Sequence, residues 1–322
     1  MKTALVCGAG GFIGHNLVKR LKRENFWVRG VDVKYPEFEE SQADEFLRAD
    51  LATVAGAEAA VDREFAEIYQ LAADMGGAGY IFTGDSDADI VHNSALINLN
   101  VLHQTRKFAP GRIFYSSSAC VYPLHNQLDP DTPDTAEDSV YPAFPDSEYG
   151  WEKLFSERLY LTHHRNFGLP VRVARFHNIF GPLGAWNDGK EKVPAAMCRK
   201  VAMAADPGEI EIWGDGKQTR SFLYIDECLD AMRLLMDSNV LDPINIGSDE
   251  MVSINQLATM VADVAGKTIT LKHIDGPLGV RGRTSDNRMI EEKLGWRPGR
   301  NLRSGLETTY AWISEQVKNS QA

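Results

Sequence analysis

The sequence predicts an α/β protein with a doubly wound parallel sheet and a smaller mixed α/β lobe in its C-terminal part. Three features of the 322-residue chain support this fold class. Short apolar runs alternate with helix-like stretches through residues 1–178. A glycine-rich segment separates the first apolar run from the first helix, and the alternation stops after residue 178.

The predicted strands are short runs rich in β-branched and aromatic residues, which is typical of strands buried on both faces. They cover residues 4–7, 28–33, 68–73, 112–116 and 171–176. Helix-like stretches lie between them, at residues 12–23, 95–108 and 148–166. Strand–helix alternation of this kind builds a parallel sheet with right-handed crossovers.

Beyond residue 178 the sequence predicts a second lobe. Two glycine-rich loops, residues 181–184 and 187–189, precede a helix that starts near Pro194, since proline is tolerated in a first helical turn. Strands are expected at residues 209–213 and 221–225, and helices at 226–238, 253–265, 286–294 and 302–318. We predict a first lobe of residues 1–178, to which residues 221–248 return, and a second lobe of residues 179–220 and 249–322.

Composition excludes several classes of partner. The net charge of −11 argues against binding nucleic acid or an anionic membrane, because both attract positive surfaces. No apolar run approaches the ~18 residues of a membrane span, and residues 4–7 are too short for a signal-peptide core. The cysteines, at positions 7, 120, 198 and 228, fit no zinc spacing. We expect a cytoplasmic protein with reduced cysteines and without a metal ion.

The glycine-rich segment, residues 8–14 (GAGGFIG), joins the first strand to the first helix. Glycine lets backbone N–H groups approach a pyrophosphate, and a helix N-terminus favours the negative charge. Asp32 ends the second strand, where a carboxylate accepts hydrogen bonds from ribose hydroxyls and repels a 2′-phosphate. The pattern is typical of a Rossmann-type sheet and predicts NAD rather than NADP, although a glycine turn without a ligand is an alternative.

Tyr149 and Lys153 are four residues apart in a helix-like stretch and therefore share one face. A free tyrosine has a pKa near 10, and a cation one turn away favours its phenolate. A Tyr-x-x-x-Lys pair is common by chance, but here it follows both the glycine segment and the serines at 116–118. Those serines end an apolar strand, which is where open α/β sheets bind ligands.

These motifs resemble the extended short-chain dehydrogenase/reductase family. Residues 149–153 (YGWEK), 175–182 (RFHNIFGP) and 219–226 (TRSFLYID) are similar to its nucleotide-sugar branch, and the similarity extends from residue 3 to about 315. The resemblance implies that Ser118 and Tyr149 contact a sugar at the carbon that is oxidised. It also implies that NAD lies against Gly8, Gly10, Gly11, Phe12, Ile13, Gly14, Asp32, Asp50, Leu51, Leu71, Ala72, Ala73, Tyr149 and Lys153.

Within that branch the chain is similar to enzymes that invert C3 and C5 of a GDP-hexose. The similarity lies in residues 71–77 (LAADMGG), 118–123 (SACVYP), 189–196 (GKEKVPAA) and 279–283 (GVRGR). It implies that Cys120 and Lys192 are an acid/base pair and that the catalytic set is Ser118, Cys120, Tyr149, Lys153 and Lys192. The implied substrate contacts are Gly76, Ser118, Ala119, Cys120, Asn178, Glu191, Lys192, Val193, Lys200, Gln218, Thr219, Arg220 and Arg283.

Chemistry supports this assignment. A ketone at C4 of a hexose makes the hydrogens on C3 and C5 removable as protons, and inversion needs a base on one face and an acid on the other. A thiol with a pKa near neutrality and an ammonium with a depressed pKa suit that task. The resemblance also implies a homodimer, in which residues 95–108 and 148–166 of each subunit form a four-helix interface.

Other functions remain open from the residues alone. An epimerase-reductase acting on a GDP-4-keto-6-deoxy sugar is expected to use NADP and a histidine in place of Lys192. A sugar dehydratase would carry an acidic pair at Ala119 and Cys120, and a simple 4-epimerase would need neither Cys120 nor Lys192. A non-catalytic nucleotide-binding protein could also use this fold.

Overall fold

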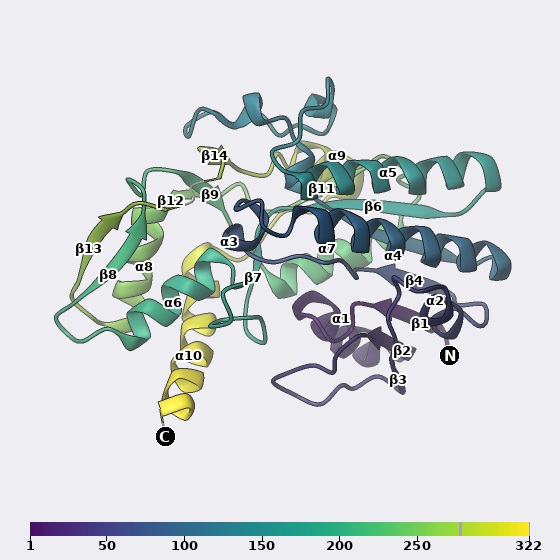
Figure 1. The fold of residues 1–322 in the computed structure, drawn as a ribbon, viewed down its shortest axis with the longest axis horizontal. Coiled ribbons are helices and arrows are strands. Elements are labelled where there is room, and N and C mark those ends of the chain that lie inside the picture. Colours follow the sequence, from purple (N-terminus) through teal and green to yellow (C-terminus); the bar gives the residue numbers. More distant parts are fainter. Residues whose placement is uncertain (277–278, 322) are drawn as a thin grey trace.

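The computed structural model describes residues 1–276 and 279–321, and its two lobes lie on the right and left of Figure 1. The first lobe is built on a seven-stranded, all-parallel sheet with the order β11-β6-β5-β4-β1-β2-β3. Its strands are β1 (Thr3–Cys7), β2 (Trp27–Asp32), β3 (Glu45–Arg48), β4 (Glu67–Gln70), β5 (Arg112–Ser118), β6 (Val171–Phe176) and β11 (Ile244–Ile246). This is the Rossmann order with one strand added at the β6 edge, so the predicted fold class is confirmed.

Helices cover both faces of this sheet (Figure 1). They are α1 (Phe12–Arg23), α2 (Val54–Ala60), α4 (Asp87–Phe108), α5 (Glu148–Phe167) and α7 (Ile225–Asp237). The short helix α3 (Ala78–Ile81) instead contributes Ile81 to a small cluster with Cys120 and Tyr149. Side chains alternate along a strand, so Ala4 and Val6 join a core cluster with α1 and α7, whereas Leu5 and Cys7 join a second cluster with α4 and α5. Burial on both faces explains why these strands are continuous apolar runs in the sequence.

Two strands of the sheet are missing from the sequence prediction. β3 has four residues and β11 has three, and neither is long enough to give a recognisable apolar run. The single strand predicted at residues 221–225 is wrong, because Phe222 separates two short strands and Ile225 is already helical. β9 (Thr219–Ser221) and β10 (Leu223–Tyr224) are short, and α7 already begins at Ile225.

In the second lobe the C-terminal helix α10 (Leu302–Gln321) packs against α6 (Val193–Met203) and α8 (Ile254–Ala265). β8 (Gly208–Trp213) pairs with β13 (Ile269–Ile274), and β9 lies between β12 (Met251–Ser253) and β14 (Gly282–Arg283). The remaining elements are β7 (Ile179–Phe180), which pairs with β10, and α9 (Arg288–Leu294).

A buried polar network braces the segment that follows β5. Asn245, on β11, is fully buried, and its Oδ1 accepts a hydrogen bond from the Tyr122 hydroxyl at 2.6 Å and lies 2.9 Å from His177 Nε2. Its Nδ2 donates to the backbone oxygens of Thr135 and Asp286, at 2.8 and 3.1 Å. Burial lowers the pKa of His177 to about 3, so this ring is neutral and structural.

Within residues 1–276 and 279–321, none of the helices combines the length and the hydropathy that a bilayer span requires. The same described residues contain no group of three or more His, Cys, Asp and Glu side chains placed to hold a metal ion. All four cysteines are buried and free.

Asn245→Ala should lower the free energy of unfolding by at least about 2 kcal/mol, because it leaves several buried polar groups without their partner. Urea denaturation followed by circular dichroism would measure the change. Asn239→Ala, at an exposed position, is the matched control and should change stability by no more than about 0.5 kcal/mol. Equal stability of the two variants would show that the network does not brace the fold.

Candidate functional site

One cavity of about 1070 Å³ runs along the carboxyl ends of the strands of the first lobe and continues into the second lobe. It is lined by the glycine segment, by the ends of β4 and β5, by the start of α5 and by residues 188–200. Of the residues that the sequence predicts for the site, Thr219 does not line the cavity. The Thr219 hydroxyl instead donates to the backbone oxygen of Pro130. All the other predicted site residues line the cavity.

The glycine segment forms a cradle that fits a dinucleotide. A Cβ built on Gly14 would lie 2.0 Å from the backbone oxygen of Gly8, so a side chain there would push the start of α1 off the loop. The first turn of α1 carries neither an acidic residue nor a capping side chain. The helix therefore offers its N-terminal partial charge to a phosphate of the ligand.

Asp32 stands at the end of β2 beside this cradle. Its Oδ2 accepts a hydrogen bond from the Gly10 N–H at 3.0 Å, and burial raises the pKa of its carboxyl above the usual value. Asp50 also lines the cavity, and its Oδ1 accepts from the Ala52 N–H at 2.9 Å. A carboxylate in the position of Asp32 fits a ribose with free hydroxyls and opposes a 2′-phosphate.

Sequence reasoning missed the cover of this end of the cavity. Residues 33–38 line it, apart from Tyr35, and the ring of Phe38 packs edge-on against Trp312 of α10 at a centroid distance of 5.0 Å. Glu39 accepts a hydrogen bond from Lys19 at 2.6 Å. No local sequence pattern predicts that residues 33–38 line the cavity, because they form an irregular loop. The loop packs against Trp312, which is far away in the sequence.

Tyr149 and Lys153 both enter the cavity from the first two turns of α5. The helix is capped by Ser147, whose Oγ accepts from the Gly150 N–H at 3.2 Å. Lys153 Nζ donates to the backbone oxygen of Ser116 at 2.9 Å and lies 5.6 Å from the centre of the Tyr149 ring. Burial lowers the pKa of Lys153 and raises that of Tyr149, and a hydrogen bond with Ser118 opposes the rise at Tyr149.

Cys120 follows β5 in a single 3-10 turn, Ala119–Val121. The Ser118 hydroxyl caps this turn by accepting from the Cys120 N–H at 3.2 Å. A Cβ on Gly150 would lie 2.2 Å from the backbone oxygen of Cys120, so only glycine lets α5 approach the turn this closely. The thiol is buried in a small cluster with Tyr149, and burial raises its pKa.

Lys192 reaches the same region from the second lobe. It is the residue that precedes α6, and its Nζ donates to the backbone oxygen of Gly76 at 3.3 Å. Burial lowers the pKa of the Lys192 ammonium. The structure thus brings a thiol from the first lobe and an amine from the second lobe to one cavity.

The other polar side chains of the second lobe form a wall around this centre. Arg283 lies 3.4 Å from Cys120 Sγ through Nη1, and Arg220 donates to the backbone oxygens of Thr219 and Val280 at 2.7 Å each. Asn178 adopts a positive φ of 45° and donates to Ser221 O at 3.0 Å. The buried oxygens Glu191 Oε2 and Gln218 Oε1 make no hydrogen bond within the described residues, although both residues line the cavity.

Comparison with known proteins identifies the family. Residues 4–247 match the model of the NAD dependent epimerase/dehydratase family. The chain belongs to this family. NAD is the cofactor of the NAD dependent epimerase/dehydratase family, and the cradle at residues 8–14 with Asp32 fits it, so the prediction of NAD is confirmed.

Individual family members resemble the chain along nearly its whole length. The GDP-mannose 3,5-epimerase of Arabidopsis thaliana is 44% identical, over 98% of this chain and 83% of that protein. GDP-mannose 3,5-epimerase 1 of Oryza sativa subsp. indica is 43% identical, over 98% and 82%. The solved structure of a UDP-glucuronic acid 4-epimerase from Bacillus cereus, in complex with UDP-glucuronic acid and NAD, has a TM-score of 0.82 at 25% identity, over 98% and 99%.

Asp32→Ala should reduce the preference for NAD over NADP by roughly tenfold or more, because it removes both a charged hydrogen-bond acceptor and the repulsion of a 2′-phosphate. Titration of both cofactors into the apoprotein, followed by fluorescence, gives the two dissociation constants. Asp85→Ala removes an exposed acid outside the cavity and should leave their ratio unchanged. An unchanged ratio in Asp32→Ala would contradict the assignment.

Proposed function

We propose that this chain is a GDP-mannose 3,5-epimerase, which converts GDP-D-mannose to GDP-L-galactose and GDP-L-gulose. The observation that carries the proposal is the meeting of Cys120 and Lys192 with Tyr149 in one cavity of a chain 44% identical to such an enzyme. The reaction needs three tasks at one sugar, which are oxidation at C4, inversion at C5 and C3, and reduction at C4.

Bound NAD supplies the redox chemistry at C4 and is regenerated in each turnover. Tyr149 takes the proton of the C4 hydroxyl, and Ser118 holds the same oxygen. Lys153 supplies the positive charge that favours the Tyr149 phenolate, and its fixed position against Ser116 O keeps it one helical turn away. The burial of these groups keeps water away from the sugar carbon while it is a ketone.

Cys120 and Lys192 carry out the inversions in this proposal. Once C4 is a ketone, one group removes a proton from the neighbouring carbon and the other delivers a proton to the opposite face. They come from different lobes, so a sugar lying between the lobes is flanked by both. Burial lowers the pKa of Lys192 and so increases the share of free amine, which is the form that can accept a proton.

The remaining wall residues hold the GDP-sugar. Lys200 and Arg220 place cations at the cavity of a chain whose net charge is −11, which suits a diphosphate, and Arg283 lies on the same wall beside Cys120. The unpaired oxygens of Glu191 and Gln218 accept hydrogen bonds from the ligand. Gly76, Ala119, Asn178 and Val193 shape the wall, and Thr219 supports it from behind.

The rival functions account for fewer of these features. A GDP-4-keto-6-deoxymannose epimerase-reductase would need NADP, which Asp32 opposes, and a histidine in place of Lys192. A simple 4-epimerase gives no reason for a thiol and a lysine to be buried at the same cavity.

We also propose how the chain is divided and where it works. Residues 1–178 with 221–248 form the NAD-binding lobe, and residues 179–220 with 249–322 form the nucleotide-sugar lobe. Pro277, Leu278 and Ala322 of the latter range lie outside the described residues. A cytoplasmic location agrees with four free cysteines and with the use of NAD.

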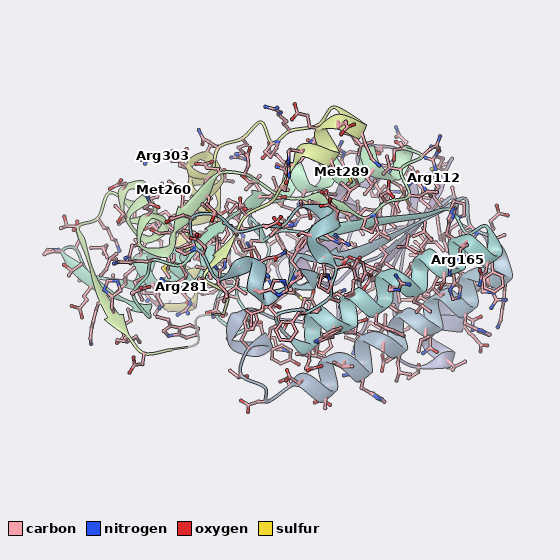
Figure 2. The ribbon with its side chains drawn as sticks, turned by 90° about the horizontal axis from the view of Figure 1, so that it is seen from above. Arg112, Arg165, Met260, Arg281, Met289 and Arg303 are labelled. Carbon is pink, nitrogen blue, oxygen red and sulfur yellow. The ribbon has the colours of Figure 1, made fainter. Side chains whose placement is uncertain are left out.

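A homodimer is supported by an apolar face on α4 and α5, which lie side by side (Figures 1 and 2). Leu99 of α4 is 43% exposed, and Trp151 and Phe155 of α5 are 43% and 50% exposed. Trp151 and Phe155 are four residues apart and share one face of their helix. Packing this face against its copy by a two-fold axis would bury it in a four-helix interface.

Incubation of the enzyme and GDP-mannose in D₂O tests the function. Deuterium should enter C5 and C3 but not C4, because the hydrogen of C4 does not exchange with solvent. Cys120→Ala and Lys192→Ala should each reduce the incorporation by about 10²–10⁴-fold, the usual size of an acid/base contribution. NMR of the recovered sugar measures all three positions.

Tyr149→Phe is the control in this experiment, and it should abolish incorporation at C3 and C5 together, since no ketone forms. If Cys120→Ala and Lys192→Ala both exchange at the wild-type rate, the two residues are not the acid/base pair and a simple 4-epimerase becomes the better assignment.

Phe155→Glu should convert the dimer to a monomer, because it places a charge in the apolar interface. Light scattering should give about twice the chain mass of 35.8 kDa for the wild type and the single mass for the variant. Leu241→Glu, at a position that is 39% exposed and lies between α7 and β11, should remain a dimer. A wild-type protein of single mass at micromolar concentration would rule out the interface.

A further inference from the structure

A buried ion pair lies directly behind Cys120. Arg283 is 5% exposed, and the side chain of Asp146 is 1% exposed. The guanidinium is fixed at three points, with Nη1 3.4 Å from Cys120 Sγ, Nε donating to Gln127 Oε1 at 2.7 Å, and Nη2 donating to Asp146 Oδ2. Asp146 itself does not line the cavity, and its carboxylate is bonded to Arg283 and to the Ser147 hydroxyl.

The charges around Cys120 need this arrangement. The titratable and charged groups that face the thiol are Asp146, Tyr149, Lys153, Lys192, Arg220 and Arg283. Most of these groups are cations, and a buried arginine beside a thiol favours the thiolate. A thiolate held in an ion pair with Arg283 would be a poor proton carrier. It has no proton to donate, and the ion pair with Arg283 makes it a weaker base.

Asp146 opposes that outcome. Its carboxylate neutralises the guanidinium, and burial together with Asp146 raises the pKa of Cys120, while Arg283 and Lys192 act in the other direction. Burial lowers the pKa of Lys192 at the same cavity. Both directions favour a neutral thiol and a neutral amine, which together hold one mobile proton.

We propose that Asp146 is a positioning residue that cancels the charge of Arg283 and thereby keeps the resting proton of the Cys120–Lys192 pair on the sulfur. The catalytic role of that proton rests on the proposed function. The protonation state of Cys120, in contrast, can be measured without enzyme turnover. Asp146 also accepts from the Ser147 hydroxyl at 2.8 Å, which links the ion pair to the cap of α5 and so to Tyr149.

The decisive variant is Asp146→Asn, which removes a charge and keeps an oxygen that can accept from Arg283. Gln127 holds the guanidinium from a second side, so the arginine should stay against the thiol. Cys120 alkylation by iodoacetamide is followed against pH in the NAD-loaded enzyme, with mass spectrometry of the peptide that contains Cys120. The midpoint should fall by about one to two pH units in Asp146→Asn, since Arg283 is then no longer neutralised.

Two further variants make the test specific. Asp146→Glu should return the midpoint towards the wild-type value, because the charge is restored. Asp215→Asn is the matched control: Asp215 pairs with Arg281 at 3.1 and 3.2 Å on the surface, two residues from Arg283 in sequence, and its loss should leave the midpoint unchanged. An unchanged or raised midpoint in Asp146→Asn would overturn the proposal.

A double variant tests the same proposal if Asp146→Asn alone does not fold. Arg283→Gln alone should raise the midpoint, and Arg283→Gln with Asp146→Asn should bring it back to within about half a pH unit of wild type, because both charges are absent. A double variant that titrates like Arg283→Gln would contradict the cancellation. Failure of the wild type to epimerise GDP-mannose would remove the proposed function but leave these titrations readable.

Discussion

The close contact between the start of α5 and the turn that follows β5 is the constraint on which the site depends. The absence of a side chain at Gly150 lets the helix rest on the backbone oxygen of Cys120. Lys153, one turn further along, then reaches Ser116 O on the same strand. Strand, turn and helix become one rigid unit, so the serine, the thiol and the tyrosine keep fixed relative positions without any ligand.

A buried ion pair between β6 and α5 supports this unit. Arg175 of β6 pairs with Glu157 of α5 through two contacts of 2.9 Å, and Ser117 donates to the same carboxylate at 2.5 Å. Replacing one partner would leave a buried charge, which is far more costly than the net contribution of the pair. Such a network fixes a single position for α5, and it therefore also fixes the positions of Tyr149 and Lys153 on that helix.

The second lobe supplies what the Rossmann sheet lacks. The sheet and α5 hold the residues proposed for the redox step, whereas Lys192, Arg220 and Arg283 come from segments that lie beyond residue 178. Arg283 reaches Cys120 and Asp146, so the proposed acid/base centre is completed only by residues from both parts of the chain. This division lets one cofactor lobe serve different sugar chemistries when the residues of the other lobe change.

The sequence by itself determined the parts of the protein that are local. The cradle at residues 8–14, Asp32 at a strand end, and the four-residue spacing of Tyr149 and Lys153 are each readable because a single turn, strand or helix fixes their geometry. The long strands were readable because burial on both faces makes them apolar. Only the tertiary structure decided the strands β3 and β11, the cover of the cofactor end at residues 33–38, and the contact of Asp146 and Arg283 behind Cys120. Those features join residues that are far apart in the chain, and no local pattern records which distant side chain completes a buried ion pair.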